Sequence, residues 1–210
     1  MRPALIVIAK APVPGRVKTR LCPPCTPLEA ALLARAALLD TLAAAARSRA
    51  GRRVLALDGA PGSWVPTGFE VIAQRGEGLA ERLAAAFADV GGPAFLVGMD
   101  TPQLTPELLD EGLDAVAVGD SAFGVALDGG YWGIGLRRPD PAVFAGVPMS
   151  TARTGAVQRA QMALLGLRPR TLPPLLDVDT FQDALAVAAD APGTRFAAEV
   201  AAVMSDEAAA

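Results

Sequence analysis

The chain has 210 residues, enough for one domain with a sizeable buried core, and its formal net charge is −3 with an isoelectric point near 5.0. This acidic balance argues against a nucleic-acid-binding protein, which needs a broad basic face. The sequence contains no histidine, so Ser-His-Asp and Cys-His catalysis and most transition-metal sites are excluded.

The first predicted element is a buried strand over residues 4–9, an unbroken apolar run rich in β-branched types. Although 52% of all residues are hydrophobic, much of this is alanine, and no uncharged apolar run approaches the roughly 18 residues of a membrane span. Lys10 also ends the N-terminal apolar run below the length of a secretory signal. We therefore expect a cytoplasmic protein with no membrane partner.

The loop after this strand is basic and contains stiff turn residues. Its cations are Lys10, Arg16, Lys18 and Arg20, and its turn residues are Pro12, Pro14 and Gly15. Ligands of open α/β sheets bind where loops leave the carboxyl ends of strands, so the loop predicts a site for a phosphorylated or otherwise anionic ligand. The alternative is a run of solvated surface charges. The spacing matches neither a P-loop nor a dinucleotide-binding glycine motif.

Cys22 and Cys25 form a C-x-x-C pair in the same loop. A thioredoxin-type motif opens a helix directly after a strand, whereas this pair lies in the middle of a long loop. A zinc ion would also lack two ligands there. The pattern therefore argues against a redox or metal role.

Strands and helices then alternate. A capping box from Thr26 to Glu29 predicts a helix over residues 27–49. The next predicted elements are strands over 53–58 and 69–74, a helix over 79–90, a strand over 95–99 and a helix from 105 to 118. This alternation predicts a mostly parallel sheet with helices on both faces.

The second half begins with a predicted hairpin, in which strands over 122–127 and 131–136 are joined by the turn residues 128–130. The elements expected after it are an irregular stretch over 139–149, a helix from a cap at 150–151 toward 167, a strand over 175–179, a short helix from 180 and a helix over 193–203. We expect one domain over residues 1–204 and a disordered tail over 205–210.

Three aspartates stand where strands are predicted to end. Asp100 follows the strand over 95–99, and Asp177 and Asp179 flank the end of the last predicted strand. If these strands are neighbours, Asp100 and Asp179 face each other across a cleft that also holds the basic loop. Mg²⁺ takes one or two carboxylates and completes its shell with phosphate oxygens and water, so the arrangement predicts a metal site. The alternative is that each aspartate only caps a turn or a helix.

Six motifs, in this order, resemble a known family. They are residues 9–21, Gln74 with residues 78–82, residues 98–102, residues 128–131, Ser150-Thr151 and residues 177–180. Together they resemble a bacterial group of GT-A-type nucleotide-diphospho-sugar transferase-like proteins, commonly described as glycosyltransferases without a defined substrate. More remotely, the pattern is similar to the guanylyltransferases for 2-phospho-L-lactate and the molybdenum cofactor and to sugar-nucleotide pyrophosphorylases. The resemblance implies a GT-A-like α/β fold, a three-layer sandwich with a mixed, mostly parallel sheet.

The resemblance also implies residue roles. Nucleotide binding falls to Lys10, Gly15, Arg16, Lys18, Arg20, Gln74 and Gly78, with the last two near the base. Metal binding, to Mg²⁺ or Mn²⁺, falls to Asp100 and Asp179, with Asp177 as the fallback for the second ligand. The acceptor side falls to Gly129, Gly130, Tyr131, Ser150 and Thr151, and the catalytic roles fall to Lys18, Asp100 and Asp128. Met149, where an aromatic residue is more usual, and the cysteine pair depart from the family pattern.

Two reactions fit these residues. We favour nucleotidyl transfer from an NTP to a phosphorylated small-molecule acceptor, because four cations suit a triphosphate. Glycosyl transfer from a nucleotide-diphospho-sugar is the alternative, and there the acceptor hydroxyl would want a base such as Asp128. A nucleotide-binding protein without turnover is the third reading. The base, the acceptor and the oligomeric state stay open.

Overall fold

The computed structural model describes residues 2–119 and 121–209 and arranges them around a seven-stranded sheet. The strands are β1 Ala4–Lys10, β2 Arg52–Asp58, β3 Glu70–Ala73, β4 Ala94–Val97, β5 Ser121–Ala126, β6 Tyr131–Leu136 and β7 Arg170–Leu175, in the order β3-β2-β1-β4-β6-β5-β7. β6 is antiparallel to β4 and β5, and the other neighbours are parallel. The predicted mixed, mostly parallel sheet is confirmed.

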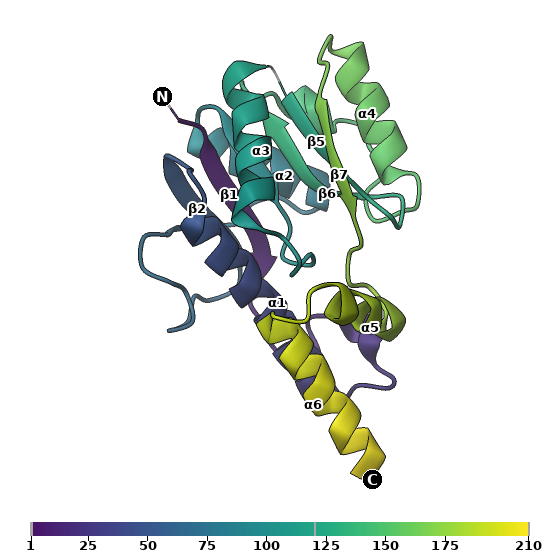
Figure 1. Cartoon of the computed structure of the whole chain (residues 1–210). Coiled ribbons are helices and arrows are strands. Elements are labelled where there is room, and N and C mark those ends of the chain that lie inside the picture. The colour runs from purple at the N-terminus through teal and green to yellow at the C-terminus, as the bar shows by residue number, and fades with distance from the viewer. Residues whose placement is uncertain (1, 120, 210) are drawn as a thin grey trace.

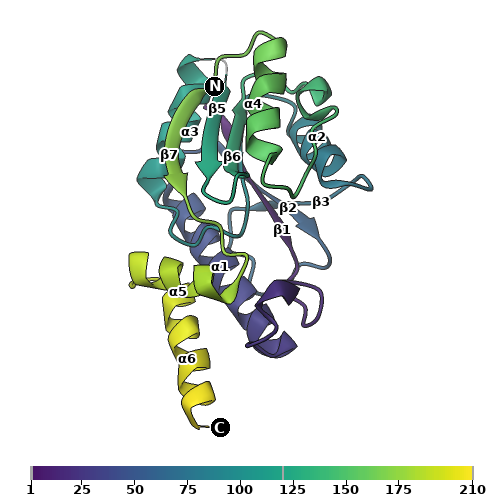
Figure 2. The same ribbon diagram turned by 90° about the vertical axis from the view of Figure 1, so that its right-hand side faces the viewer.

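Helices cover both faces of the sheet (Figures 1 and 2). The α-helices are α1 Pro27–Arg47, α2 Leu79–Val90, α3 Pro106–Val118, α4 Thr154–Leu164, α5 Phe181–Asp190 and α6 Arg195–Ala209, with short 3₁₀ helices at Thr19–Leu21 and Pro141–Phe144. The capping box predicted for α1 is present, because Thr26 and Glu29 bond each other's backbone N–H groups. No helix in the described part of the chain combines the length and hydropathy that a membrane crossing requires.

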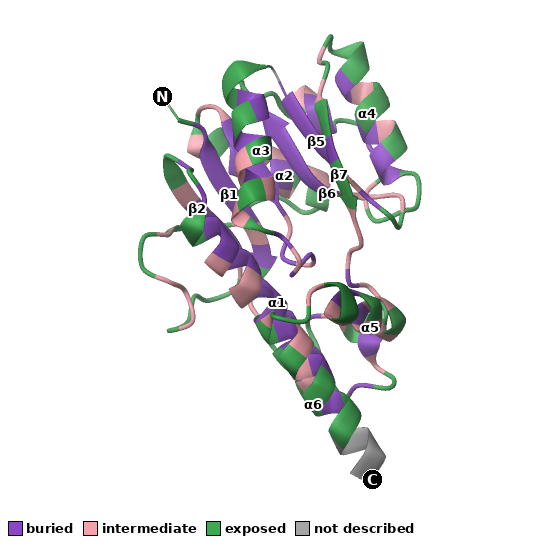
Figure 3. Cartoon of the chain, viewed as in Figure 1, coloured by how far each residue is buried: buried purple, intermediate pink, exposed green. Residues whose placement is uncertain are grey.

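The core forms two layers, one on each face of the sheet, because successive side chains of β1 point to opposite faces. Leu5 and Val7 belong to the cluster under α1 and α3, whereas Ala4 and Ile6 belong to the cluster under α2 and α4. The central strands are accordingly buried along their length (Figure 3). This continuous burial explains why these strands read as unbroken apolar runs in the sequence.

A third cluster lies outside the sheet. The first half of α1 extends past the carboxyl ends of β1 and β2, where α6 packs against α1 and α5 packs against α6 (Figure 1). Leu33 of α1, Val187 of α5 and Phe196 of α6 are buried there, and Cys22 and Cys25 pack into the same cluster. Both cysteines thus help to anchor the end of the loop after β1 to this third cluster.

The C-terminal part differs from the prediction in three places. The last strand is β7 at Arg170–Leu175, not residues 175–179, and it was missed because Pro173 and Pro174 lie inside it. Prolines are tolerated there because β7 is an edge strand that pairs only with β5. The stretch over 139–149 contains a 3₁₀ helix, and α6 extends through 205–209, which were expected in a disordered tail. Residue 210 lies outside the described residues.

Candidate functional site

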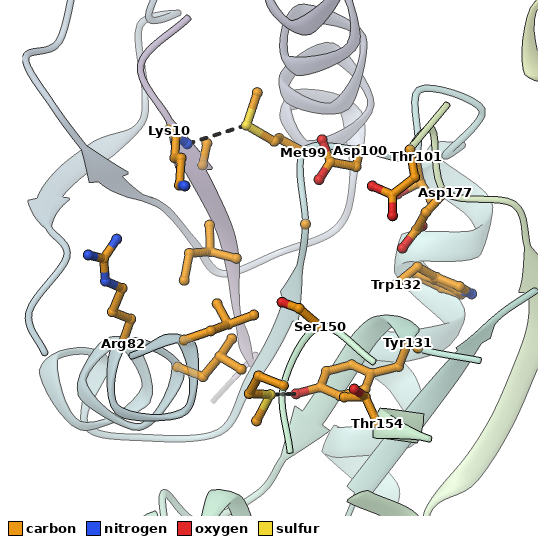
Figure 4. A pocket seen from close by; sticks show the side chains of 18 of the residues that line it. Lys10, Arg82, Met99, Asp100, Thr101, Tyr131, Trp132, Ser150, Thr154 and Asp177 are labelled. Atoms are coloured by element: carbon orange, nitrogen blue, oxygen red, sulfur yellow. Dashed lines mark hydrogen bonds between the residues drawn. The ribbon is translucent and has the colours of Figure 1, made fainter. Parts of the chain in front are cut away.

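A cleft of about 840 Å³ opens at the carboxyl ends of β1 and β4. These two strands are parallel neighbours, so the loops that follow them leave at the same edge of the sheet. β6 is antiparallel to β4, and the turn that precedes it therefore reaches the same edge. The cleft thus collects segments that lie far apart in the sequence, as Figure 4 shows.

Most of the predicted site residues line this cleft. They are Lys10, Arg16, Lys18, Arg20, Gln74, Asp100, Asp128, Gly130, Tyr131, Ser150, Thr151, Asp177 and Asp179. Gly15, Gly78 and Gly129 are not among the lining residues. The basic loop and the acidic residues therefore share one crevice, while the individual roles assigned to them stay predictions.

Lys18 is the most constrained cation of the first loop. Its backbone is left-handed, with φ of 49°, and its ammonium lies 2.6 Å from Asp100 Oδ1 while it also donates a hydrogen bond to the carbonyl of Val178. Its side chain is only 9% exposed, whereas Lys10 and Arg16 lie open to solvent. The loop therefore brings to the cleft one mostly buried cation, paired with Asp100, and several exposed cations.

Asp177 carries the strongest electrostatic signal of the site. Burial, and after it the charges of Asp100 and Asp128, raises the pKa of its carboxyl to about 7, although Lys18 acts in the opposite direction. Its Oδ1 atom is buried and has no hydrogen-bond partner among the described residues. A buried carboxylate oxygen without a partner is costly, so an ordered water or a bound ligand is expected to satisfy it.

Asp179 lies in a different environment. Its carboxylate is 42% exposed and accepts from the guanidinium of Arg20 at 3.0 Å. The segment after β4 and the segment before α5 are joined instead by Val178, whose backbone N–H donates to the carbonyl of Asp100 at 3.0 Å. Asp179, the predicted second ligand, and Asp177, the fallback, thus both line the cleft with Asp100 and differ in environment, and the assignment of the second ligand stays a prediction.

The residues present fit a divalent cation that is shared with a substrate. No group of three or more Asp, Glu or Cys side chains within residues 2–119 and 121–205 forms a metal site by itself. Mg²⁺ and Mn²⁺ favour oxygen ligands, and Mg²⁺ in particular takes one or two carboxylates with substrate phosphates and water. Asp100 and the unpartnered oxygen of Asp177 line the cleft together and would supply such a pair.

Gln74 has a structural task at the edge of the cleft. Its side-chain amide donates to the carbonyls of Ala9 and Ala56, at 2.8 and 3.0 Å, and thereby ties the end of β1 to β2. Arg82, which the sequence analysis quoted in a motif without a role, lines the cleft from α2 and pairs with Asp58 at 2.8 Å. Its position at the cleft was not evident because the motif alone does not tell which side of α2 faces the sheet.

The glycine turn of the hairpin packs against the segment before α4. Gly129 has φ of +91°, and a Cβ atom there would lie 2.1 Å from the carbonyl oxygen of Ala152. Its own carbonyl accepts from the N–H of Gly155 at 2.8 Å. Gly129 therefore positions the turn, while Asp128 uses one oxygen to accept from the N–H of Gly130 at 2.8 Å.

The predicted cap at Ser150 and Thr151 is wrong in its detail. Helix α4 begins at Thr154, and Arg153 occupies the position before it. Ser150 and Thr151 instead form a loop at the cleft, where Ser150 has a left-handed backbone with φ of 59°. The Thr154 hydroxyl holds this loop by donating to the carbonyl of Pro148 at 2.7 Å.

Tyr131 lines an apolar part of the same cleft (Figure 4). Its hydroxyl lies 3.3 Å from Gln158 Oε1 and 4.0 Å from the sulfur of Met149, and burial raises the pKa of the phenol. Ile8 and Leu96 also line the cleft and belong to the same hydrophobic cluster as Tyr131 and Met149. The cleft therefore has a charged part between Lys10 and Asp177 and an apolar part around Tyr131.

Comparison with solved structures bears out the expected fold. A protein of Desulfovibrio desulfuricans G20, provisionally assigned as a nucleotide-diphospho-sugar transferase, has 29% identity and a TM-score of 0.85 over 99% of this chain and 96% of that one. The manganese complex of Rv0371c from Mycobacterium tuberculosis H37Rv has 22% identity and a TM-score of 0.53, covering 89% and 98% of the two chains. CMP:2-keto-3-deoxy-manno-octonic acid synthetase complexed with CTP has 14% identity and a TM-score of 0.55, covering 89% and 97%.

The GT-A-like fold that the motifs predicted is thus confirmed, and the neighbours are consistent with the predicted transferase class. At 14% and 22% identity, the likeness to the latter two proteins shows the fold alone. A comparison with proteins of curated function gives no match. The model of one family, described as "Uncharacterized protein conserved in bacteria (DUF2064)", matches residues 32–151. The chain belongs to the DUF2064 family.

Proposed function

We propose that the chain is a divalent-metal-dependent transferase that moves a nucleotidyl group from an NTP to a phosphorylated small molecule. One observation carries the proposal: Lys18, from the loop after β1, meets Asp100, which follows β4, at 2.6 Å in a cleft that Asp177 also lines. A cationic loop next to paired carboxylates is the arrangement that a metal-bound polyphosphate needs.

The charges of the cleft support a triphosphate donor. Lys10, Arg16 and Arg20 are exposed on the loop, and Arg82 adds a further cation from α2. Several cations spread over one wall match the charge of a triphosphate better than that of a diphosphate. The manganese complex of Rv0371c and the CTP complex of the synthetase are precedents for such ligands on this fold.

In this reaction an oxygen of the acceptor phosphate attacks the α-phosphorus of the NTP. The bond from that phosphorus to the oxygen bridging to the β-phosphate breaks, and pyrophosphate leaves. The attacking phosphate is already ionised, so no general base is required. Asp100 and Asp177 would hold Mg²⁺ or Mn²⁺, which neutralises charge on the phosphates when bound. Lys10 and Arg16 would orient the phosphates.

Glycosyl transfer is the second candidate, and the likeness to the Desulfovibrio protein favours it. There an acceptor hydroxyl attacks the anomeric carbon of a nucleotide-diphospho-sugar, and a nucleoside diphosphate leaves. Asp128 would then take the proton of the hydroxyl, since its Oδ1 is held by Gly130 and the carboxylate lies at the cleft. A protein that binds nucleotides without turnover is the third candidate.

The released product separates the three candidates. The purified chain is incubated with Mg²⁺ or Mn²⁺, with the four NTPs and a panel of phosphorylated acceptors, and separately with sugar nucleotides. Nucleotidyl transfer releases pyrophosphate, and glycosyl transfer releases a nucleoside diphosphate. Asp100→Asn should abolish the activity, while Asp114→Asn, on the exposed surface of α3, should leave it unchanged. Binding of a nucleotide without either product would favour the third candidate.

A further inference from the structure

We propose that the Lys18 ammonium is a built-in counter-ion of the carboxylates and that a divalent cation binds tightly only when phosphates draw this ammonium away. The inference rests on the proposed function, because it assumes that Asp100 and Asp177 hold a metal. It adds a regulation of that site: nucleotide and metal would bind cooperatively, and the metal alone would bind weakly.

The ammonium of Lys18 occupies the place where the carboxylates need positive charge. It lies 2.6 Å from Asp100 Oδ1, and its side chain is 9% exposed. It also donates to the carbonyl of Val178, the residue directly after Asp177. One lysine therefore joins the segment after β4 to the segment before α5, the two segments that carry the proposed metal ligands.

A divalent cation and this ammonium compete for the same oxygen of Asp100. A metal ion that binds Asp100 Oδ1 must displace Lys18 from it, and a mostly buried ammonium without a partner is strongly unfavourable. The charged hydrogen bond that is lost raises the cost of binding the metal. Metal binding in the absence of another anion is therefore opposed by the protein itself.

Phosphates can remove this opposition. The exposed cations Lys10 and Arg16 attract a polyphosphate to the rim of the same cleft. A phosphate oxygen that accepts from Lys18 frees Asp100 and replaces the partner that the ammonium loses. Lys18 lies in a loop, has a left-handed backbone and directly precedes a three-residue 3₁₀ helix. Its side chain can therefore change partners without disrupting a long helix or strand.

The substitution Lys18→Met tests this directly, because it removes the charge and keeps an unbranched side chain. Binding of Mn²⁺ alone is measured by electron paramagnetic resonance of the free ion. We expect Lys18→Met to bind Mn²⁺ about tenfold more tightly than the wild type, or more, as the loss of one charged hydrogen bond predicts. Lys18→Arg, which keeps the charge, should bind Mn²⁺ as weakly as the wild type.

Lys10→Met is the matched control. It removes one positive charge from the same cleft, but Lys10 forms no ion pair within the described part of the chain. The general change in potential should therefore raise its affinity for Mn²⁺ by less than about threefold. Circular dichroism and thermal unfolding confirm that each variant is folded before the affinities are compared.

A measurement on the wild type covers the case in which Lys18→Met does not fold. The ammonium groups of lysine are followed by ¹H–¹⁵N NMR, and the Lys18 signal is assigned with Lys18→Arg. Tripolyphosphate alone should shift this signal, whereas Mg²⁺ alone should leave it in place at concentrations that bind when tripolyphosphate is present.

The outcomes separate the inference from the proposed function. A folded Lys18→Met variant that binds Mn²⁺ no more tightly than the wild type overturns the counter-ion role and leaves the metal site standing. The counter-ion role is also overturned if the Lys18 signal shifts with Mg²⁺ alone, or if tripolyphosphate does not shift it. If no variant binds metal with or without tripolyphosphate, both proposals fail.

Discussion

Two ion pairs join the first loop to the acidic segments of the cleft, and they differ in burial. Lys18 and Asp100 form the inner pair, in which the lysine side chain is 9% exposed and the aspartate side chain is 42% exposed. The unpartnered oxygen of Asp177 lines the same cleft. Arg20 and Asp179 form the outer pair, with 68% and 42% exposure. Water reaches both partners of the outer pair, whereas in the inner pair it reaches the carboxylate and the ammonium is mostly enclosed by protein. The comparison teaches that burial of the cation, rather than the presence of opposite charges, distinguishes the proposed reaction centre from its rim.

The largest expected effect separates the two neighbouring aspartates. Asp177→Asn should lower kcat/KM for pyrophosphate release by about a hundredfold or more, because it removes a proposed metal ligand. Asp179→Asn, which breaks only an exposed ion pair, should lower it by less than about fivefold. If Asp179→Asn lowers kcat/KM more than Asp177→Asn does, the assignment of Asp177 is wrong, and Asp179 is the second metal ligand, as the sequence predicts.

The pH dependence of stability sharpens the same comparison. The pKa of Asp177 is raised from 3.8 to about 7, so the folded state holds this proton more firmly than the unfolded state. Below pH 4 both states are protonated and no cost arises, whereas above pH 7 the folded metal-free protein bears a cost on the order of a few kcal/mol. Stability should therefore be lost as the pH rises from 4 to 7.

Asp177→Asn should remove this loss. Urea unfolding of the metal-free proteins at several pH values between 4 and 8 measures it, with Asp179→Asn as the control for the general change in charge. The free energy of unfolding of Asp177→Asn should exceed that of the wild type increasingly toward pH 8. Parallel curves for all three proteins would show that Asp177 ionises in the folded state as an ordinary carboxyl does.

Sequence reasoning found the framework because the elements that build the cleft have strong local signals. The apolar runs of β1 and β4 are buried on both faces, and the turn residues 128–130 join β5 to β6 as predicted. It failed at β7, where two prolines hide an edge strand. Local pattern predicts an element well when burial on both sides dictates its composition.

The choice between Asp177 and Asp179 depends on contacts that no local pattern contains. Val178 is 1% exposed, and its backbone is held by Lys18 and by the carbonyl of Asp100. These contacts join residues separated by more than 70 positions, so they fix the two aspartates only in the folded chain. The sequence motif predicts both aspartates as candidate ligands, and only the tertiary structure shows that their environments differ.

A smaller effect is expected at Gln74, at the edge of the cleft, where its side chain bonds to the backbone of two strands. Gln74→Ala should lower the free energy of unfolding by about 1–3 kcal/mol, because the carbonyls of Ala9 and Ala56 lose its amide as a donor. Glu77→Ala, at an exposed position that also lines the cleft, should change it by less than about 0.5 kcal/mol. Thermal or urea unfolding measures both variants, and equal effects would show that the two hydrogen bonds of Gln74 add little to stability.

The smallest effect is expected at Lys10, on the rim. Its side chain is exposed, and it should contribute to nucleotide binding mainly through its charge. Lys10→Gln should weaken binding of an NTP, measured by calorimetry at low salt, by about three- to tenfold, and leave the free energy of unfolding unchanged. Because salt screens an exposed charge, the difference from the wild type should shrink toward zero near 1 M salt. A loss that persists at high salt would mean that Lys10 makes a shielded contact with the phosphates, and the distinction between an inner centre and a screened rim would then not extend to the cation at the end of β1.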